Sequence, residues 1–124
     1  MGKNIALVDD SKSFCMLVSS LLASRGHMVV AFHDAESFLA NDVKRDAFDL
    51  FLFDINLPGM DGLEMIACLK SDPELAHTPT LLLTGDATKG RVTQAANYGI
   101  AGYIAKPIDP EPFVQRVLAV LALR

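Results

Sequence analysis

Three aspartates, a threonine and a lysine are the residues whose types and positions in this sequence could do chemistry together. Asp9 and Asp10 follow the first short apolar run of the chain, and Asp54 follows the third. Thr84 and Lys106 close two later runs of the same kind. Three carboxylates against one ammonium leave an excess of negative charge, and like charges held close together raise one another's pKa. A divalent cation bound among them would relieve that repulsion.

The chemistry of such a set favours a magnesium site beside a nucleophile. Oxygen ligands suit a hard cation, and a site with few protein ligands and several retained waters favours Mg²⁺ over Ca²⁺. Asp54 follows Leu50–Phe53, a run typical of a buried central strand. A partly buried carboxylate beside a cation is suited to attack a phosphoryl group. Pro107 allows a cis bond that would turn the Lys106 amine over the site, and the sequence leaves this isomer open.

Ordinary structural roles would account for some of these residues. Asp10 lies just before a predicted helix and could cap it. Asp54 could begin a turn, because Pro58 and Gly59 follow it. Lys106 could be an ordinary solvated lysine. Helix capping explains neither Asp54 nor Lys106, so the residues taken as a set favour a functional site.

The elements that must position these residues alternate between strands and helices. Short apolar segments predict five strands, at Ile5–Val8, Met28–Phe32, Leu50–Phe53, Thr80–Leu83 and Tyr103–Ala105. Several are apolar at successive positions, which is typical of strands covered on both faces and favours a parallel sheet. Ligands of such sheets bind outside the carboxyl ends of the strands. All the polar residues singled out above would therefore meet at one edge of the sheet.

Five helices are predicted between and after the strands. The first carries its apolar face on Phe14, Leu17, Val18, Leu21 and Leu22. Helix boundaries are indicated by a stop at Gly26 and by capping residues at Asp34, at Asp61 with Glu64, and at Asp109 with Pro110. The fourth helix, near Ala87–Asn97, has a weak pattern and contains Gly90. Right-handed crossovers place helices on both faces, so the sequence predicts an α/β doubly wound fold.

Composition narrows the class of protein. The 124 residues, 51% of them hydrophobic, predict one domain over residues 1–124 with a sizeable core. A net charge of −4 argues against direct nucleic-acid binding, and no apolar run is long enough to cross a membrane. The N-terminus shows no secretory signal. Cys15 and Cys68 form no disulfide framework, and each is expected to be a small buried hydrophobe, which favours a reduced, cytoplasmic location.

Four segments of the sequence together resemble the response-regulator receiver domains of two-component signalling, including chemotaxis regulators. They are Leu7-Val8-Asp9-Asp10-Ser11, the stretch from Phe53-Asp54-Ile55-Asn56 through Pro58-Gly59-Met60-Asp61-Gly62, Leu83-Thr84-Gly85, and Lys106-Pro107. All four occur in order, each at the end of an expected strand, which makes the match specific. The resemblance covers essentially all 124 residues. It implies a flavodoxin-like sheet of strand order 2-1-3-4-5 with five helices.

The resemblance implies the chemistry of the site. Asp54 would become a 4-aspartylphosphate by accepting a phosphoryl group from a histidine kinase or a histidine phosphotransfer protein. Asp9 and Asp10 would hold Mg²⁺ together with Asp54 and the backbone carbonyl of Asn56. The domain would catalyse its own phosphorylation, and water would later hydrolyse the acyl phosphate. Such a domain is not a conventional turnover enzyme.

The resemblance also implies how the signal leaves the site. Thr84 would bond one phosphoryl oxygen and Lys106 another. Tyr103 matches the family's switch aromatic, with a plain core tyrosine as the alternative. The surface formed by the fourth helix, the fifth strand and the fifth helix would then change and contact a downstream output protein or effector domain. Asn56 and Asp86 flank the site and could tune the lifetime of the phosphoryl group.

Three other functions remain open on the sequence. A phosphatase with an aspartyl nucleophile usually has a second carboxylate two residues later, where Asn56 follows Asp54 here. A flavodoxin-like nucleotide binder would need a glycine-rich loop after the first strand, which the sequence lacks. A degenerate receiver could bind partners without phosphorylation. The pathway, the kinase, the output partner and the oligomeric state on phosphorylation are not determined, nor is whether the chain stands alone or is a fragment.

Overall fold

Alternating strand and helix segments form a parallel sheet covered on both faces. The structure, a computed structural model, describes residues 2–40, 47–57, 59, 62–73, 75–85 and 96–122. The strands are β1 (Asn4–Val8), β2 (Met28–Phe32), β3 (Leu50–Asp54), β4 (Thr80–Thr84) and β5 (Gly102–Ala105). The described helices are α1 (Lys12–Ala23), α2 (Ala35–Ala40), α3 (Gly62–Lys70) and α5 (Pro110–Ala122). The strand order β2-β1-β3-β4-β5, parallel throughout, confirms the predicted doubly wound sheet.

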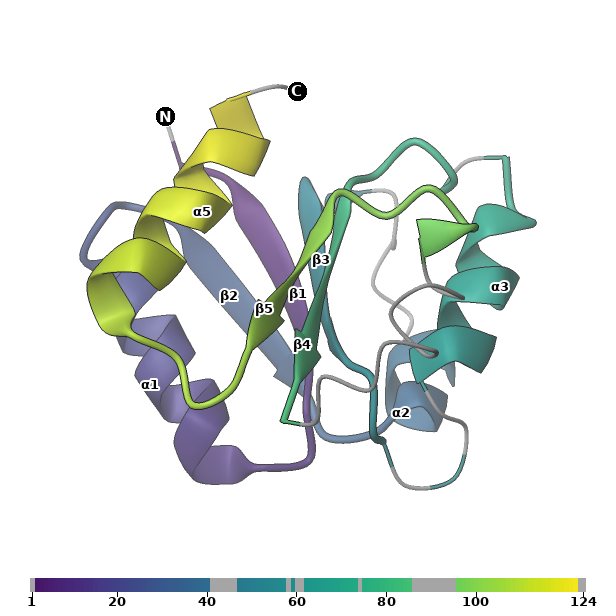
Figure 1. Cartoon of the computed structure of the whole chain (residues 1–124), viewed down its shortest axis with the longest axis horizontal. Coiled ribbons are helices and arrows are strands. Elements are labelled where there is room, and N and C mark those ends of the chain that lie inside the picture. The colour runs from purple at the N-terminus through teal and green to yellow at the C-terminus, as the bar shows by residue number, and fades with distance from the viewer. Residues whose placement is uncertain are drawn as a thin grey trace.

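The central strands are continuously apolar because helices cover both of their faces. In Figure 1, α1 and α5 lie on one side of the sheet, and α2 and α3 lie on the other. Successive side chains of a strand point to opposite faces. In β1, Ile5 and Leu7 pack in the core on the α1 and α5 side, whereas Ala6 and Val8 pack in the core on the α2 and α3 side. The side chains of the central strands β1, β3 and β4 are therefore buried up to the residue where each strand ends, except for Asn4 at the start of β1.

The first helix differs from its predicted arrangement in two respects. Ser11 caps it, because the Ser11 hydroxyl accepts a hydrogen bond from the Phe14 backbone N–H at 3.2 Å. The alternative role of Asp10 as the helix cap is therefore wrong. Leu17 was expected inside but is 43% exposed, since the stripe that faces the sheet is Cys15, Val18 and Leu22.

The other helices partly confirm the predicted boundaries. Asp34 precedes α2 and accepts the Ser37 N–H on its Oδ1, and α5 begins at Pro110 as predicted. Cys68 was expected to be buried but is exposed, because α3 buries Met65, Ile66 and Leu69 instead.

Four of the five expected helices lie in the described part of the chain. The fourth, near Ala87–Asn97, falls largely on residues 86–95, which lie outside that part, and so does Asp61 of the expected capping box. Among the described residues, no helix is long and apolar enough to cross a membrane.

Candidate functional site

The carboxyl ends of four strands bring the predicted residues to one edge of the sheet, the lower edge in Figure 1. Asp9 and Asp10 directly follow β1, and Asp54 is the last residue of β3. Thr84 ends β4, and Lys106 directly follows β5. This edge, defined by these five residues, is called the rim below. The predicted convergence is confirmed for Lys106 with Asp9 and Asp54, and for the three carboxylates with one another.

The Lys106 ammonium joins the two buried carboxylates of the rim. Asp9 is 0% exposed and Asp54 is 6% exposed. The Lys106 Nζ donates to Oδ2 of Asp9 at 2.5 Å and to Oδ2 of Asp54 at 3.1 Å. The Ser11 N–H donates to Oδ1 of Asp9, and the Asn56 N–H donates to Oδ1 of Asp54, each at 2.9 Å. Every oxygen of these two carboxylates therefore accepts a hydrogen bond, as the burial of charge requires.

Burial and neighbouring charges have opposite effects on the pKa values of Asp54 and Lys106. Burial raises the pKa of Asp54, although the Asn56 N–H and the Lys106 charge act to lower it. Burial alone would lower the pKa of Lys106, but its hydrogen bond to Asp9 and the charges of Asp54 and Asp9 raise that pKa overall. Lys106 therefore stays a cation at neutral pH, in contact with Asp54.

The three carboxylates fit a hard divalent cation. Asp9, Asp10 and Asp54 each offer one oxygen, and these oxygens lie within 4.8 Å of one another. Asp10 is exposed, so a cation held there would keep contact with water. A small set of carboxylate ligands combined with retained water is the arrangement that Mg²⁺ prefers.

The family of the chain follows from its sequence and from this rim together. Residues 5–118 match the family model described as the response regulator receiver domain. The chain belongs to the response regulator receiver domain family. It is 33% identical over 109 residues to the chemotaxis protein CheY-3 of Vibrio cholerae, covering 86% of this chain and 84% of that protein.

Two further proteins extend the likeness of this receiver domain over nearly its whole length. The polar-differentiation response regulator DivK of Brucella ovis is 32% identical over 122 residues, which is 98% of each chain. A solved structure of the BeF3-activated DrrB receiver domain superposes with a TM-score of 0.84 at 32% identity, covering 98% of this chain and 99% of that one.

In this receiver domain Thr84 ends β4, the strand next to β3, and Tyr103 lies on the edge strand β5 beyond it. Thr84 is buried, at 1% exposure, and its carbonyl accepts the Lys106 backbone N–H at 2.8 Å. Tyr103 pairs in register with Leu82 of β4 and is 46% exposed. A Cβ built on Gly85 would meet nothing within 4 Å, so space stays open beside Thr84.

Three residues that contact Asp9 or Lys106 of the rim were not predicted from the sequence. Ser11 donates its N–H to Asp9, and His33 makes a hydrogen bond of 3.2 Å between its Nδ1 and the Asp9 carbonyl oxygen. The Phe14 ring lies 4.4 Å from the Lys106 Nζ. The role of Ser11 could have been predicted, since a serine just before an amphipathic run marks the start of a helix. The roles of His33 and Phe14 could not, because their contacts depend on how separate elements pack. The Lys106–Pro107 bond, left open by the sequence, is cis.

Proposed function

We propose that this receiver domain accepts a phosphoryl group on Asp54 from the phosphohistidine of a histidine kinase or a histidine phosphotransfer protein. The observation that carries the proposal is the Lys106 ammonium, which joins Asp9 and Asp54 at the rim. A solvent-exposed lysine, or one that paired with a single acid, would not be expected between two buried carboxylates. The same lysine is placed to accompany a phosphoryl group on Asp54, because it already contacts the accepting side chain.

Asp9, Asp10 and Asp54, with the backbone carbonyl of Asn56, would hold Mg²⁺. When bound, the ion would supply positive charge against the developing negative charge on the transferring oxygens. Asn56 is exposed at the start of the loop after β3, and its N–H already holds Oδ1 of Asp54. The excess of carboxylates over ammonium groups at the rim supports the need for a cation.

The transfer is a displacement at phosphorus in which Asp54 is the nucleophile. An Asp54 carboxylate oxygen forms the new P–O bond while the P–N bond to the donor histidine breaks, and the electron pair of that bond stays on the imidazole nitrogen. The Lys106 ammonium then donates to an equatorial phosphoryl oxygen, and the Thr84 hydroxyl donates to another. Water later cleaves the acyl phosphate and regenerates the carboxylate, so the domain returns to its starting state.

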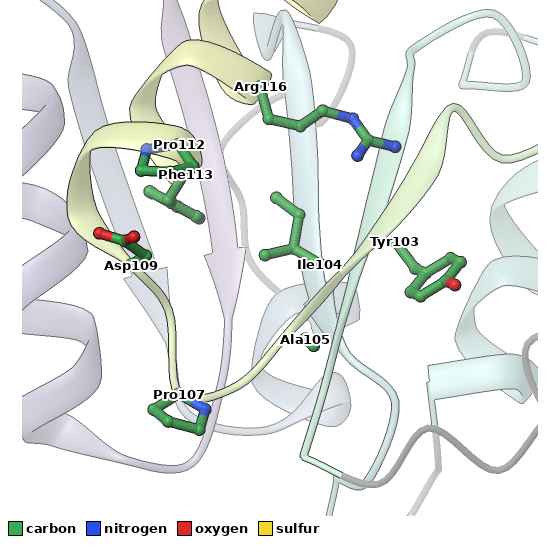
Figure 2. Close-up of a pocket in the computed structure, with 8 residues that line it drawn as sticks. All are labelled: Tyr103, Ile104, Ala105, Pro107, Asp109, Pro112, Phe113 and Arg116. Atoms are coloured by element: carbon green, nitrogen blue, oxygen red, sulfur yellow. The ribbon is translucent and has the colours of Figure 1, made fainter.

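The output surface would comprise the fourth helix, which falls largely outside the described residues, together with β5 and α5, which lie next to the rim. Figure 2 shows Ile104 and Phe113 on the α5 side of β5, whereas Tyr103 points to the opposite side. A pocket of about 320 Å³ between β5 and α5 is lined by Ile104, Phe113 and Arg116, among others. Phosphorylation adds negative charge at Asp54 and draws Thr84 towards it, and Tyr103 then turns inward behind Thr84. The changed face contacts a downstream protein or effector domain, in the cytoplasm where histidine kinases act.

The test is phosphorylation by acetyl phosphate in the presence of Mg²⁺. One phosphoryl group is expected, labile to hydroxylamine as an acyl phosphate is, and mapped to Asp54 by mass spectrometry. Asp54→Asn should abolish it. Asp49→Asn is the matched control, because Asp49 lies just before the opposite end of the same strand and accepts the Asn4 N–H. Equal labelling of wild type and Asp54→Asn would refute the assignment, and turnover of small phosphate esters would favour a phosphatase instead.

A further inference from the structure

One aromatic ring lies against the Lys106 ammonium at the rim. The Lys106 Nζ is 4.4 Å from the centre of the Phe14 ring, within the range of a cation–π interaction. Lys106 is 21% exposed, so this contact is partly shielded from water. Within the part of the chain that the structure describes, the Nζ also donates to two carboxylates, Asp9 and Asp54. The ammonium therefore has two charged neighbours and one neutral, electron-rich neighbour.

The position of the Phe14 ring is well defined by its surroundings. Its backbone N–H is bonded to the Ser11 hydroxyl at the first turn of α1, at 3.2 Å. Its side chain packs, partly buried, against the core on the α1 and α5 side of the sheet. Phe14 lines one pocket together with Leu17, Ile108, Gly85 and Lys106, among others. The Phe14 ring can therefore stay in contact with the Lys106 ammonium when the ammonium exchanges a carboxylate partner.

We propose that Phe14 is a positioning residue for Lys106, a proposal that rests on the proposed phosphoryl transfer to Asp54. During the transfer Lys106 exchanges a carboxylate partner for a phosphoryl oxygen. A ring attracts the ammonium through its quadrupole without accepting a full hydrogen bond or adding negative charge. Phe14 thereby keeps the ammonium over the rim during the exchange. An aliphatic side chain at this position would fill the space but would not attract the cation.

The contact itself is tested by NMR on the metal-free, unphosphorylated protein. In the wild type, the ring current of Phe14 should shift the Lys106 Cε protons upfield of those of the other lysines. Phe14→Leu should remove the shift, and Phe14→Tyr should restore it. A wild-type Lys106 without the shift would overturn the proposal, whatever the phosphorylation assays give.

The function of the contact is tested by the rate of phosphorylation from acetyl phosphate at saturating Mg²⁺. Phe14→Leu should slow the reaction by about threefold to tenfold, the range of a partly shielded cation–π contact. Phe14→Tyr should keep most of the wild-type rate. Fluorinated phenylalanines introduced at position 14 keep the shape of the ring but weaken its quadrupole, so the rate should fall stepwise with each added fluorine. Leu17→Ala, in the same pocket but without the ammonium contact, should leave the rate unchanged.

The outcomes separate this proposal from the one on which it rests. Equal rates across the fluorinated series would overturn the positioning role of Phe14, while labelling of Asp54 would still support phosphoryl transfer. The absence of labelling in every protein, wild type included, would overturn both. A stepwise loss of rate with an intact fold and an unchanged Leu17→Ala control would support Phe14 as the positioning residue.

Discussion

The two buried carboxylates of the rim and Tyr103 on strand β5, here called the β5 edge, belong to the same sheet, yet these side chains have opposite surroundings. Asp9 and Asp54 are buried at the ends of central strands, and each of their oxygens accepts a hydrogen bond. Tyr103 lies on an edge strand and is 46% exposed. Groups held by several buried contacts are rigid, whereas an exposed side chain on an edge strand is free to change rotamer. In the proposed function, this difference would let the rim perform the chemistry and the β5 edge respond to it.

Thr84 is the rim residue whose own strand pairs with β5. It ends β4, which pairs with β3 on one side and with β5 on the other. It is buried like the carboxylates, but it neighbours the strand that carries Tyr103. In the proposed function, a movement of Thr84 would therefore link the rim to the β5 edge.

The largest effect is expected for Lys106→Ala, which removes the only ammonium found at the rim within the described chain. Loss of a charged donor to the transferring group should slow phosphorylation from acetyl phosphate by about a hundredfold. Lys70→Ala is the matched control, because Lys70 is also partly buried but donates to the Ala76 carbonyl, away from the rim. Equal rates for the two variants would show that the chemistry does not depend on Lys106.

A smaller effect is expected for Asp10→Ala, measured as Mg²⁺ affinity by titration calorimetry without phosphate. Loss of one exposed carboxylate ligand should weaken binding by about tenfold, or about 1.4 kcal/mol. The fold should survive, because Ser11 rather than Asp10 caps α1. Ser11→Ala is the counterpart: it should cost about 1 kcal/mol of stability to urea with little change in affinity. The reverse pattern would make Asp10 a structural residue.

Thr84→Ala tests the link between the two regions directly. One hydrogen bond to a charged group contributes about 1.5–3 kcal/mol, enough to change a two-state equilibrium by about tenfold. The variant should still accept phosphate at Asp54 but should populate the active state poorly. The measurement is the NMR response of Tyr103 to beryllofluoride. A full wild-type response at Tyr103 would disprove the coupling through Thr84 while leaving the assignment of Asp54 intact.

The smallest effect concerns the ionisation of rim and cap carboxylates in the metal-free protein. Burial raises the pKa of Asp54, whereas the hydrogen bonds from Ser37 lower the pKa of Asp34, which caps α2. Carboxyl NMR titration should therefore give a higher midpoint for Asp54 than for Asp34. By linkage, the contribution of Asp54 to stability is lost as pH rises through its folded pKa, and that of Asp34 is lost as pH falls through its own. Reversed midpoints would contradict the burial of Asp54.

Much of the fold could be predicted because the central strands carry their own signal. Continuous apolar runs marked β3 and β4 to within one residue, since strands covered on both faces need apolar side chains at every position. The buried faces of the helices were harder to predict. Leu17 and Cys68 were predicted to be buried but are exposed. Neighbouring apolar stripes on one helix look alike in sequence, and only packing against the sheet selects the stripe that is buried.

Local sequence patterns were enough to predict the end of each strand to within one residue, and hence that acids, a hydroxyl and an amine would lie at the same edge of the sheet. This follows from local rules, because side-chain periodicity and the direction of parallel strands do not depend on distant parts of the chain. Two contacts could not be predicted in this way: Lys106 reaches both Asp9 and Asp54, and the Phe14 ring lies against its ammonium. Those contacts depend on the order of the strands and on how α1 docks on the sheet. Both are set by the packing of the whole core, which no single segment encodes.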